Sequence, residues 1–119
     1  MKEEKFKIAN IAKDLIISLD KYFVNFPKKD MELKNSIKTV ANNLLLDVYT
    51  ANASTDNNRR KVLQEDIVAK IKYLDFMINF TYDKQIINSK RYLKFCESLS
   101  YLLKYVNAWR NVGYRDEIA

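Results

Sequence analysis

The chain contains one glycine and one proline in 119 residues, and this deficit constrains its fold more than any other feature. Tight turns and the connections between strands use both residue types often. Long helices joined by a few connections need little of either, so the deficit favours an all-α fold. The sequence has no run of 18 consecutive apolar residues, so we expect these helices to pack on one another and no segment to span a membrane.

Apolar residues recur at spacings of three and four in four segments of the chain, which predicts four amphipathic helices. Pro27 is expected to end the first helix, because a proline disfavours helical dihedral angles in the residue before it. Gly113 is expected to end the last helix, and the tail after it shows no pattern. The four predicted helices span residues 3–26, 30–53, 58–82 and 88–111.

The lengths of these segments and of the corners between them determine how the helices are arranged. A helix of 20 to 25 residues is about 30–37 Å long at 1.5 Å per residue. Corners of a few residues can join only antiparallel neighbours. The sequence therefore predicts an all-α, antiparallel up-down-up-down four-helix bundle that forms a single domain over residues 1–119, with Trp109 closing one end.

The third predicted helix carries a second apolar stripe, well separated around the helix from its core stripe. A bundle helix normally buries one stripe and leaves the rest in water. Two stripes mean that the helix lies deep in the bundle or meets a second subunit. Because a chain of this size cannot surround a helix well, we favour an oligomer interface, made by Val62, Ala69, Tyr73, Phe76 and Phe80.

Positive charge is concentrated in the second half of the chain. The net charge is +6, and residues 59–119 hold twelve Lys and Arg against seven Asp and Glu. Such an excess suggests an anionic partner, most often nucleic acid, although a solvated basic surface is the alternative. Lysine and arginine neutralise phosphates, and tyrosines stack on unpaired bases. The candidate nucleic-acid-binding residues are Arg59, Arg60, Lys61, Lys70, Lys72, Lys90, Arg91, Lys94, Lys104, Tyr101 and Tyr105.

The residue types that most enzymes and metal sites need are scarce in this sequence. The chain has no histidine, which removes histidine acid–base chemistry and histidine metal ligands, and it has one cysteine, Cys96. A single glycine cannot build a glycine-rich phosphate loop of the usual form. We therefore expect no enzymatic activity, no catalytic residue, no cofactor and no metal. The charged, periodic N-terminus lacks the apolar core of a signal peptide, so a cytoplasmic location is expected.

The order of several short motifs is familiar from one group of bacterial proteins. The first helix ends in Phe26-Pro27-Lys28, and the second ends in the small and polar run Tyr49-Thr50-Ala51-Asn52. The turn Ile87-Asn88-Ser89 and Tyr92 open the last helix, which ends at Trp109. From Leu19 to Trp109 the chain resembles the accessory variability determinant family of diversity-generating retroelements. It is also similar to the wider four-helix-bundle group that includes proteins encoded in 23S rRNA intervening sequences.

The resemblance implies a non-enzymatic accessory protein. Members of the retroelement family form a barrel-like pentamer of four-helix bundles with a basic surface, bind RNA or DNA with little sequence preference, and associate with the reverse transcriptase. Asn107-Ala108 stand here where that family often has two glycines before the final tryptophan. The alternative implied by the wider group is a protein–protein scaffold of the intervening-sequence type without a nucleic-acid partner.

Overall fold

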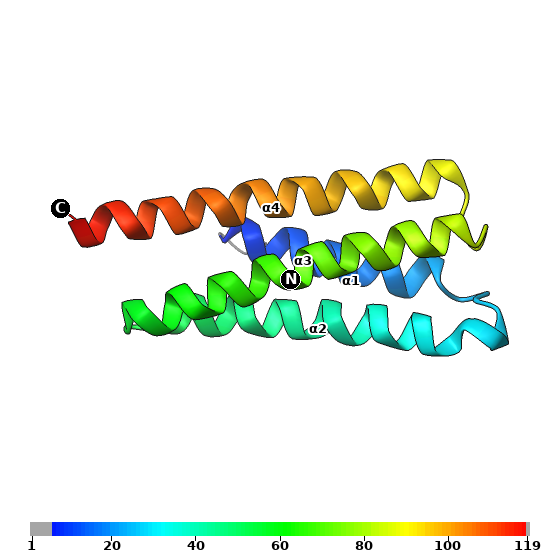
Figure 1. Ribbon diagram of the computed structural model, residues 1–119, viewed down its shortest axis with the longest axis horizontal. Coiled ribbons are helices and arrows are strands. Elements are labelled where there is room, and N and C mark those ends of the chain that lie inside the picture. Colours follow the sequence, from blue (N-terminus) through cyan, green and yellow to red (C-terminus); the bar gives the residue numbers. More distant parts are fainter. Residues whose placement is uncertain (1–5, 119) are drawn as a thin grey trace.

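The computed structural model describes residues 6–118 of the chain, and the side chains up to Val112. These residues form an antiparallel four-helix bundle, as the sequence predicts (Figure 1). The helices are α1 (Lys7–Tyr22), α2 (Met31–Ala53), α3 (Asn57–Asp83) and α4 (Ser89–Ile118), with a short 3₁₀ helix, η1 (Lys28–Asp30), before α2. Within the described range no strand is present.

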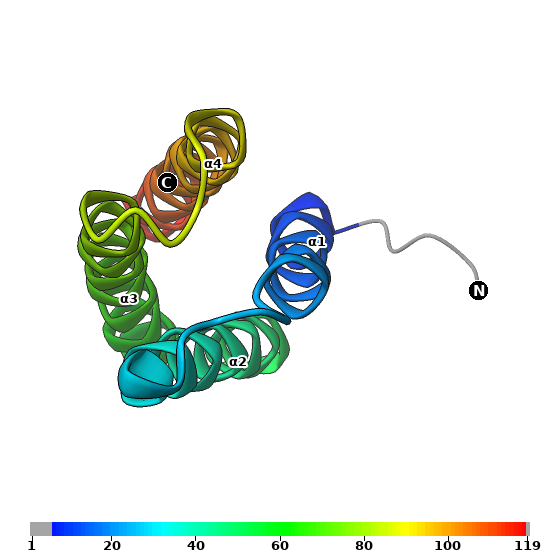
Figure 2. The same ribbon diagram turned by 90° about the vertical axis from the view of Figure 1, so that its right-hand side faces the viewer.

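The four helices surround one apolar core. Each helix packs against its neighbour in the sequence, and α1 also packs against α4, so that the bundle closes (Figure 2). As the sequence predicts, each helix contributes a stripe of apolar residues at spacings of three and four to this core. The central ones are Leu15, Leu19, Ile37, Leu44, Ile67, Leu74, Phe95 and Leu102. Trp109 of α4 lies beside the start of α1. Its ring meets the Phe6 ring edge-on, and the two ring centroids are 5.2 Å apart.

Helices α3 and α4 each begin with a side-chain cap. The Asp56 carboxylate accepts hydrogen bonds from the backbone N–H groups of Asn58 and Arg59, at 3.0 and 3.4 Å. The Asn88 side chain accepts one from the N–H of Arg91, at 2.8 Å. Each cap pairs N–H groups that the first turn of a helix leaves without a partner. The capping residues Asp56 and Asn88 therefore set where α3 and α4 start.

The first helix ends earlier than the sequence predicts. The predicted helix ends at residue 26, whereas α1 ends at Tyr22. Residues 3–5 of the predicted helix lie outside the described range. Phe23 and Phe26 both turn into the core, with ring centroids 5.0 Å apart, and Phe23 also meets Phe95 at 5.8 Å. Burial of these two rings at the end of the bundle outweighs the continuation of the helix toward Pro27.

The last helix runs further than the sequence predicts. We expected it to end near residue 111 with Gly113 as the breaker, but α4 continues through Gly113 to Ile118. A glycine inside a helix costs only about 1 kcal/mol relative to alanine. A single glycine at the end of a 30-residue helix therefore does not stop it.

Candidate nucleic-acid interface

The outward face of α4 carries four of the predicted nucleic-acid-binding residues. Lys90, Lys94, Tyr101 and Lys104 recur at helical spacing and are all exposed, while Phe95, on the other side of the helix, is buried. Among the described residues, Lys90 and Lys94 form no ion pair. Two unpaired ammonium groups one turn apart, with a half-exposed tyrosine ring further along, are suited to hold phosphates and stack on a base.

Two more of the predicted residues lie where α4 meets α1. The guanidinium carbon of Arg91 lies 3.2 Å from the centroid of the Tyr22 ring, so this cation packs on an aromatic face. The Lys7 ammonium lies 4.7 Å from the centroid of the Tyr105 ring. The hydrogen bond with Lys7, and then the charges of Lys7 and Lys104, lower the pKa of Tyr105 below its ordinary value. Arg91 and Tyr105 are thus partly engaged in holding α1 and α4 together.

The basic cluster at the start of α3 divides into two roles. Arg59 and Lys61 are exposed. Arg60 instead reaches back to the end of α2, where its Nε donates to the Ala51 carbonyl at 3.2 Å and its Nη2 donates to the Ser54 carbonyl. The last carbonyl groups of a helix have no partner within the helix. Arg60 therefore stabilises the corner between α2 and α3, and most of its donors are already in use.

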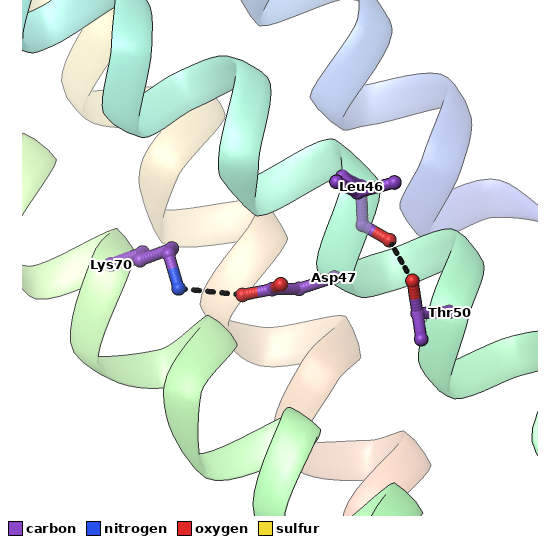
Figure 3. A network of polar contacts seen from close by, with 4 residues as sticks. All are labelled: Leu46, Asp47, Thr50 and Lys70. Atoms are coloured by element: carbon purple, nitrogen blue, oxygen red, sulfur yellow. Dashed lines mark hydrogen bonds and ion pairs between the residues drawn. The ribbon is translucent and has the colours of Figure 1, made fainter.

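The two lysines further along α3 also differ. The Lys70 ammonium donates to the Asp47 carboxylate of α2 at 2.6 Å, and both side chains are mostly buried (Figure 3). Lys72 is exposed, and its side chain forms no hydrogen bond or ion pair with the residues that the structure describes. Figure 3 also shows that the Thr50 hydroxyl donates to the Leu46 carbonyl on the same stretch of α2. Lys70 is thus neutralised by a neighbouring helix, whereas Lys72 keeps its charge toward solvent.

The structure therefore brings only part of the predicted set together. The coherent surface is the basic face, which we define as Lys90, Lys94, Tyr101 and Lys104 on α4. Glu97 lies on this same side of α4 and is also exposed. Arg59, Lys61 and Lys72 are exposed on α3, and Arg60, Lys70, Arg91 and Tyr105 have partners within the bundle.

The predicted interface residues of α3 lie on the outside of the bundle. Tyr73 and Phe76 are 50% and 61% exposed, and Val62, Ala69 and Phe80 are exposed too. The rings of Phe76 and Phe80 stack on each other, with centroids 6.1 Å apart. We call these five residues the α3 stripe. The Lys84 ammonium lies 5.1 Å from the centroid of the Phe80 ring, and all five residues are exposed. The α3 stripe therefore lies outside the core, and its role as an oligomer interface stays a prediction.

Gln64 is a buried polar residue that the sequence reasoning missed. Gln64 is 3% exposed, and among the described residues its amide nitrogen has no hydrogen-bond partner. It borders a cavity of about 590 Å³ between α3 and α4. The signal was present in the sequence, because Gln64 lies on the same face of α3 as Ile67 and Ile71, at spacings of three and seven.

The described residues contain neither a cluster of potential metal ligands nor a candidate membrane span. Residues 6–118 contain no cluster of three or more histidine, cysteine, aspartate or glutamate side chains placed to bind a metal ion. Over the same residues, no helix is both long enough and apolar enough to cross a bilayer. The surfaces that remain as candidates for function are the basic face, the α3 stripe and the cavity beside Gln64.

Comparisons with known proteins add no identification. No family model, no curated protein and no solved structure matches this chain. The functional proposal therefore depends on the surfaces described above and on the sequence resemblance.

Proposed function

We propose that this protein is a non-enzymatic accessory protein of a diversity-generating retroelement, which binds RNA or DNA with little sequence preference. The observation that carries the nucleic-acid part is the basic face, where Lys90 and Lys94 are exposed and unpaired within the described structure. Lysine holds phosphate as a point charge, and a contact with phosphate reads no base, which suits binding without sequence preference. The motif order from Leu19 to Trp109 supports the retroelement role and the reverse transcriptase as partner.

Oligomerisation belongs to the same proposal. The α3 stripe would join copies of the chain, as in the pentamer that the resemblance implies, and each copy would add another basic face. Several basic faces on one particle bind a single strand more tightly than one face alone, because later contacts form within the complex. A cytoplasmic location would bring the protein to the reverse transcriptase and its template.

The test compares two double variants that change the net charge equally. Lys90→Glu with Lys94→Glu alters the basic face, while Lys28→Glu with Lys29→Glu alters exposed lysines of η1. We expect the first pair to reduce binding to a mixed-sequence RNA/DNA duplex strongly and the second pair to reduce it little. Fluorescence anisotropy measured across a salt series gives the affinity and its slope.

The slope of affinity against salt makes this test specific. Each phosphate contact adds about 0.9 to the slope of log K against log salt on a B-form duplex. Loss of two contacts in the Lys90→Glu, Lys94→Glu variant should thus reduce the slope by about two. Equal binding by both double variants would show that the basic face does not hold the duplex.

A protein–protein scaffold without nucleic acid is the second candidate, and the α3 stripe is the observation that favours it. An apolar stripe that follows the outside of a helix is typical of a surface that meets another protein. Apolar association weakens little as salt rises, whereas phosphate binding weakens steeply. A wild-type protein that ignores the duplex at low salt but still self-associates would favour the scaffold.

A further inference from the structure

The outer side of α3 carries a longer regular pattern than the α3 stripe alone. This helix lies between α2 and α4, and its outer side faces away from the bundle (Figure 2). Asp66 lies within the α3 stripe, and Arg59 and Asp83 lie just beyond its two ends. With these three residues the spacing alternates strictly between three and four, and every member is exposed. Such alternation is typical of a helix that packs along another helix. We call these residues the α3 seam: Arg59, Val62, Asp66, Ala69, Tyr73, Phe76, Phe80 and Asp83.

The α3 seam is symmetric about Ile71, and this symmetry points to its partner. Val62 and Phe80 each lie nine residues from Ile71, and Ala69 and Tyr73 each lie two residues from it. In an antiparallel pair of α3 helices with a two-fold axis at Ile71, Val62 faces Phe80 of the second copy. Ala69 likewise faces Tyr73 of the second copy. Each small side chain is thus opposite a large one, which allows the two surfaces to pack closely.

The charges at the two ends of the α3 seam are complementary in the same arrangement. Arg59 and Asp83 each lie twelve residues from Ile71, so the antiparallel pair brings Arg59 of one copy to Asp83 of the other. Neither side chain forms an ion pair with the residues that the structure describes. Ion pairs at the rim of an interface add little affinity, but they help to fix orientation and register.

A parallel pair of α3 helices is disfavoured by the same charges. It would place Arg59, Asp66 and Asp83 each against the identical residue of the second copy, which brings like charges together. In the antiparallel pair Asp66 faces Phe76 of the second copy instead. This layer is the unfavourable one, because the contact takes a carboxylate out of water without a partner.

We propose that the α3 seam binds the α3 seam of a second copy of this chain, antiparallel and about a two-fold axis at Ile71. The contact rests on the proposed assembly through the α3 stripe and specifies its geometry. It extends over about 36 Å from Arg59 to Asp83 at 1.5 Å per residue. A closed ring of five copies needs contacts between two different surfaces. The α3 seam meets its own copy, so it builds a dimer, and a larger ring would require a further contact elsewhere on the bundle.

Disulfide cross-linking tests the register of the pair. The background variant Cys96→Ser removes the native thiol. Val62→Cys chains mixed with Phe80→Cys chains should form a mixed disulfide dimer on oxidation, identified by mass spectrometry of the linked peptides. Val62→Cys alone should not cross-link, because its two copies lie about 27 Å apart along the antiparallel pair. Cross-linking of Val62→Cys to itself, or absence of the mixed disulfide, would overturn the proposal.

Charge reversal tests the two ends of the α3 seam. Arg59→Asp and Asp83→Arg should each weaken the dimer about tenfold, because each change places like charges at both ends. The two changes in one chain restore opposite charges and should return the dissociation constant to within about threefold of the wild type. Sedimentation equilibrium measures these constants. A combined variant that is weaker than either single variant would overturn the pairing of Arg59 with Asp83.

The layer of Asp66 predicts a tighter dimer on substitution. Asp66→Leu removes the carboxylate opposite Phe76 and should strengthen association about tenfold or more. Asp75→Leu is the matched control, since Asp75 is exposed on the same helix but lies off the α3 seam. Equal effects of the two changes on the dissociation constant would show that Asp66 is not in the contact.

The mass of the wild-type protein separates this proposal from the assembly on which it rests. A mass of two 14.1 kDa chains supports the two-fold pair. A monomer at all concentrations would overturn both the pair and the proposed assembly through the α3 stripe. An oligomer that Phe76→Asp with Phe80→Asp dissociates, but that lacks the mixed disulfide, would overturn the antiparallel pair alone.

Discussion

Arg60 shows how the partner of a charged side chain decides its role. The Arg60 guanidinium donates hydrogen bonds to the carbonyls of Ala51 and Ser54 and to the side chain of Asn57. It therefore connects the end of α2 with the start of α3. Arg59, its neighbour in the sequence, points to solvent and has no such contacts. Two adjacent arginines at the start of one helix thus differ completely in what they stabilise.

Replacement of each arginine by alanine should reveal this difference. Arg60→Ala removes the guanidinium donors to the Ala51 and Ser54 carbonyls, while the Ser54 N–H still donates to Ala51 at 3.3 Å. We therefore expect it to lower the free energy of unfolding by about 1–2 kcal/mol. Arg59→Ala is the matched control and should stay within about 0.5 kcal/mol of the wild type. Urea unfolding followed by circular dichroism measures both values. Equal effects of the two changes would mean that the contacts of Arg60 add nothing to stability.

The same comparison shows why the sequence could not divide the basic residues correctly. Arg59, Arg60 and Lys61 form one cluster of charge in the sequence, and charge alone predicts one role for all three. The role of Arg60 depends on the end of α2, which comes close only after folding. Lys70 illustrates the same point, because its partner Asp47 is 23 residues away.

The elements of the bundle could be predicted better than their ends. Spacings of three and four located all four helices, because burial of an apolar stripe is a property of the local sequence. The ends of α1 and α4 were wrong, because they depend on the packing of Phe23 and Phe26 and on the tolerance of a helix for Gly113. The local sequence does predict the end of a helix where a capping residue determines it, as Asn88 does at the start of α4.

The turn between α3 and α4 holds one residue in an unfavourable conformation. Gln85 has a φ of 64°, in the left-handed region that glycine adopts without cost. The N–H groups of Gln85 and Ile86 donate to the carbonyls of Tyr82 and Thr81, at 2.8 and 3.1 Å, which closes the end of α3. This pattern usually has glycine at the position of Gln85.

Gln85→Gly should therefore stabilise the bundle. Removal of the side chain relieves a cost of about 1 kcal/mol, so we expect the melting temperature to rise by about 4 °C. Ser100→Gly, at an exposed position inside α4, provides the contrast and should lower stability by about 0.5 kcal/mol, because serine already forms helices less well than alanine. Differential scanning calorimetry measures both. A lower melting temperature for Gln85→Gly would mean that the glutamine side chain contributes more than its backbone costs.

At the scale of the whole molecule, the α3 stripe and the basic face lie on neighbouring helices. The α3 stripe is apolar and extends over about 27 Å from Val62 to Phe80 at 1.5 Å per residue. The basic face follows the outside of α4. A contact between copies through the α3 stripe would bury the apolar surface and leave the basic face in water. Assembly and nucleic-acid binding would then use different sides of the bundle.

The solution mass tests this division. We expect the wild-type protein to form an oligomer larger than the 14.1 kDa chain, as measured by light scattering after size exclusion. Phe76→Asp with Phe80→Asp places two charges in the α3 stripe and should give smaller species, because burial of an unpaired carboxylate is costly. Leu46→Asp is the control, since Leu46 is 61% exposed on α2 and lies off the stripe. Circular dichroism should show unchanged helicity in all variants. A wild-type monomer, or an oligomer that the double variant leaves intact, would show that the α3 stripe does not join copies of this chain.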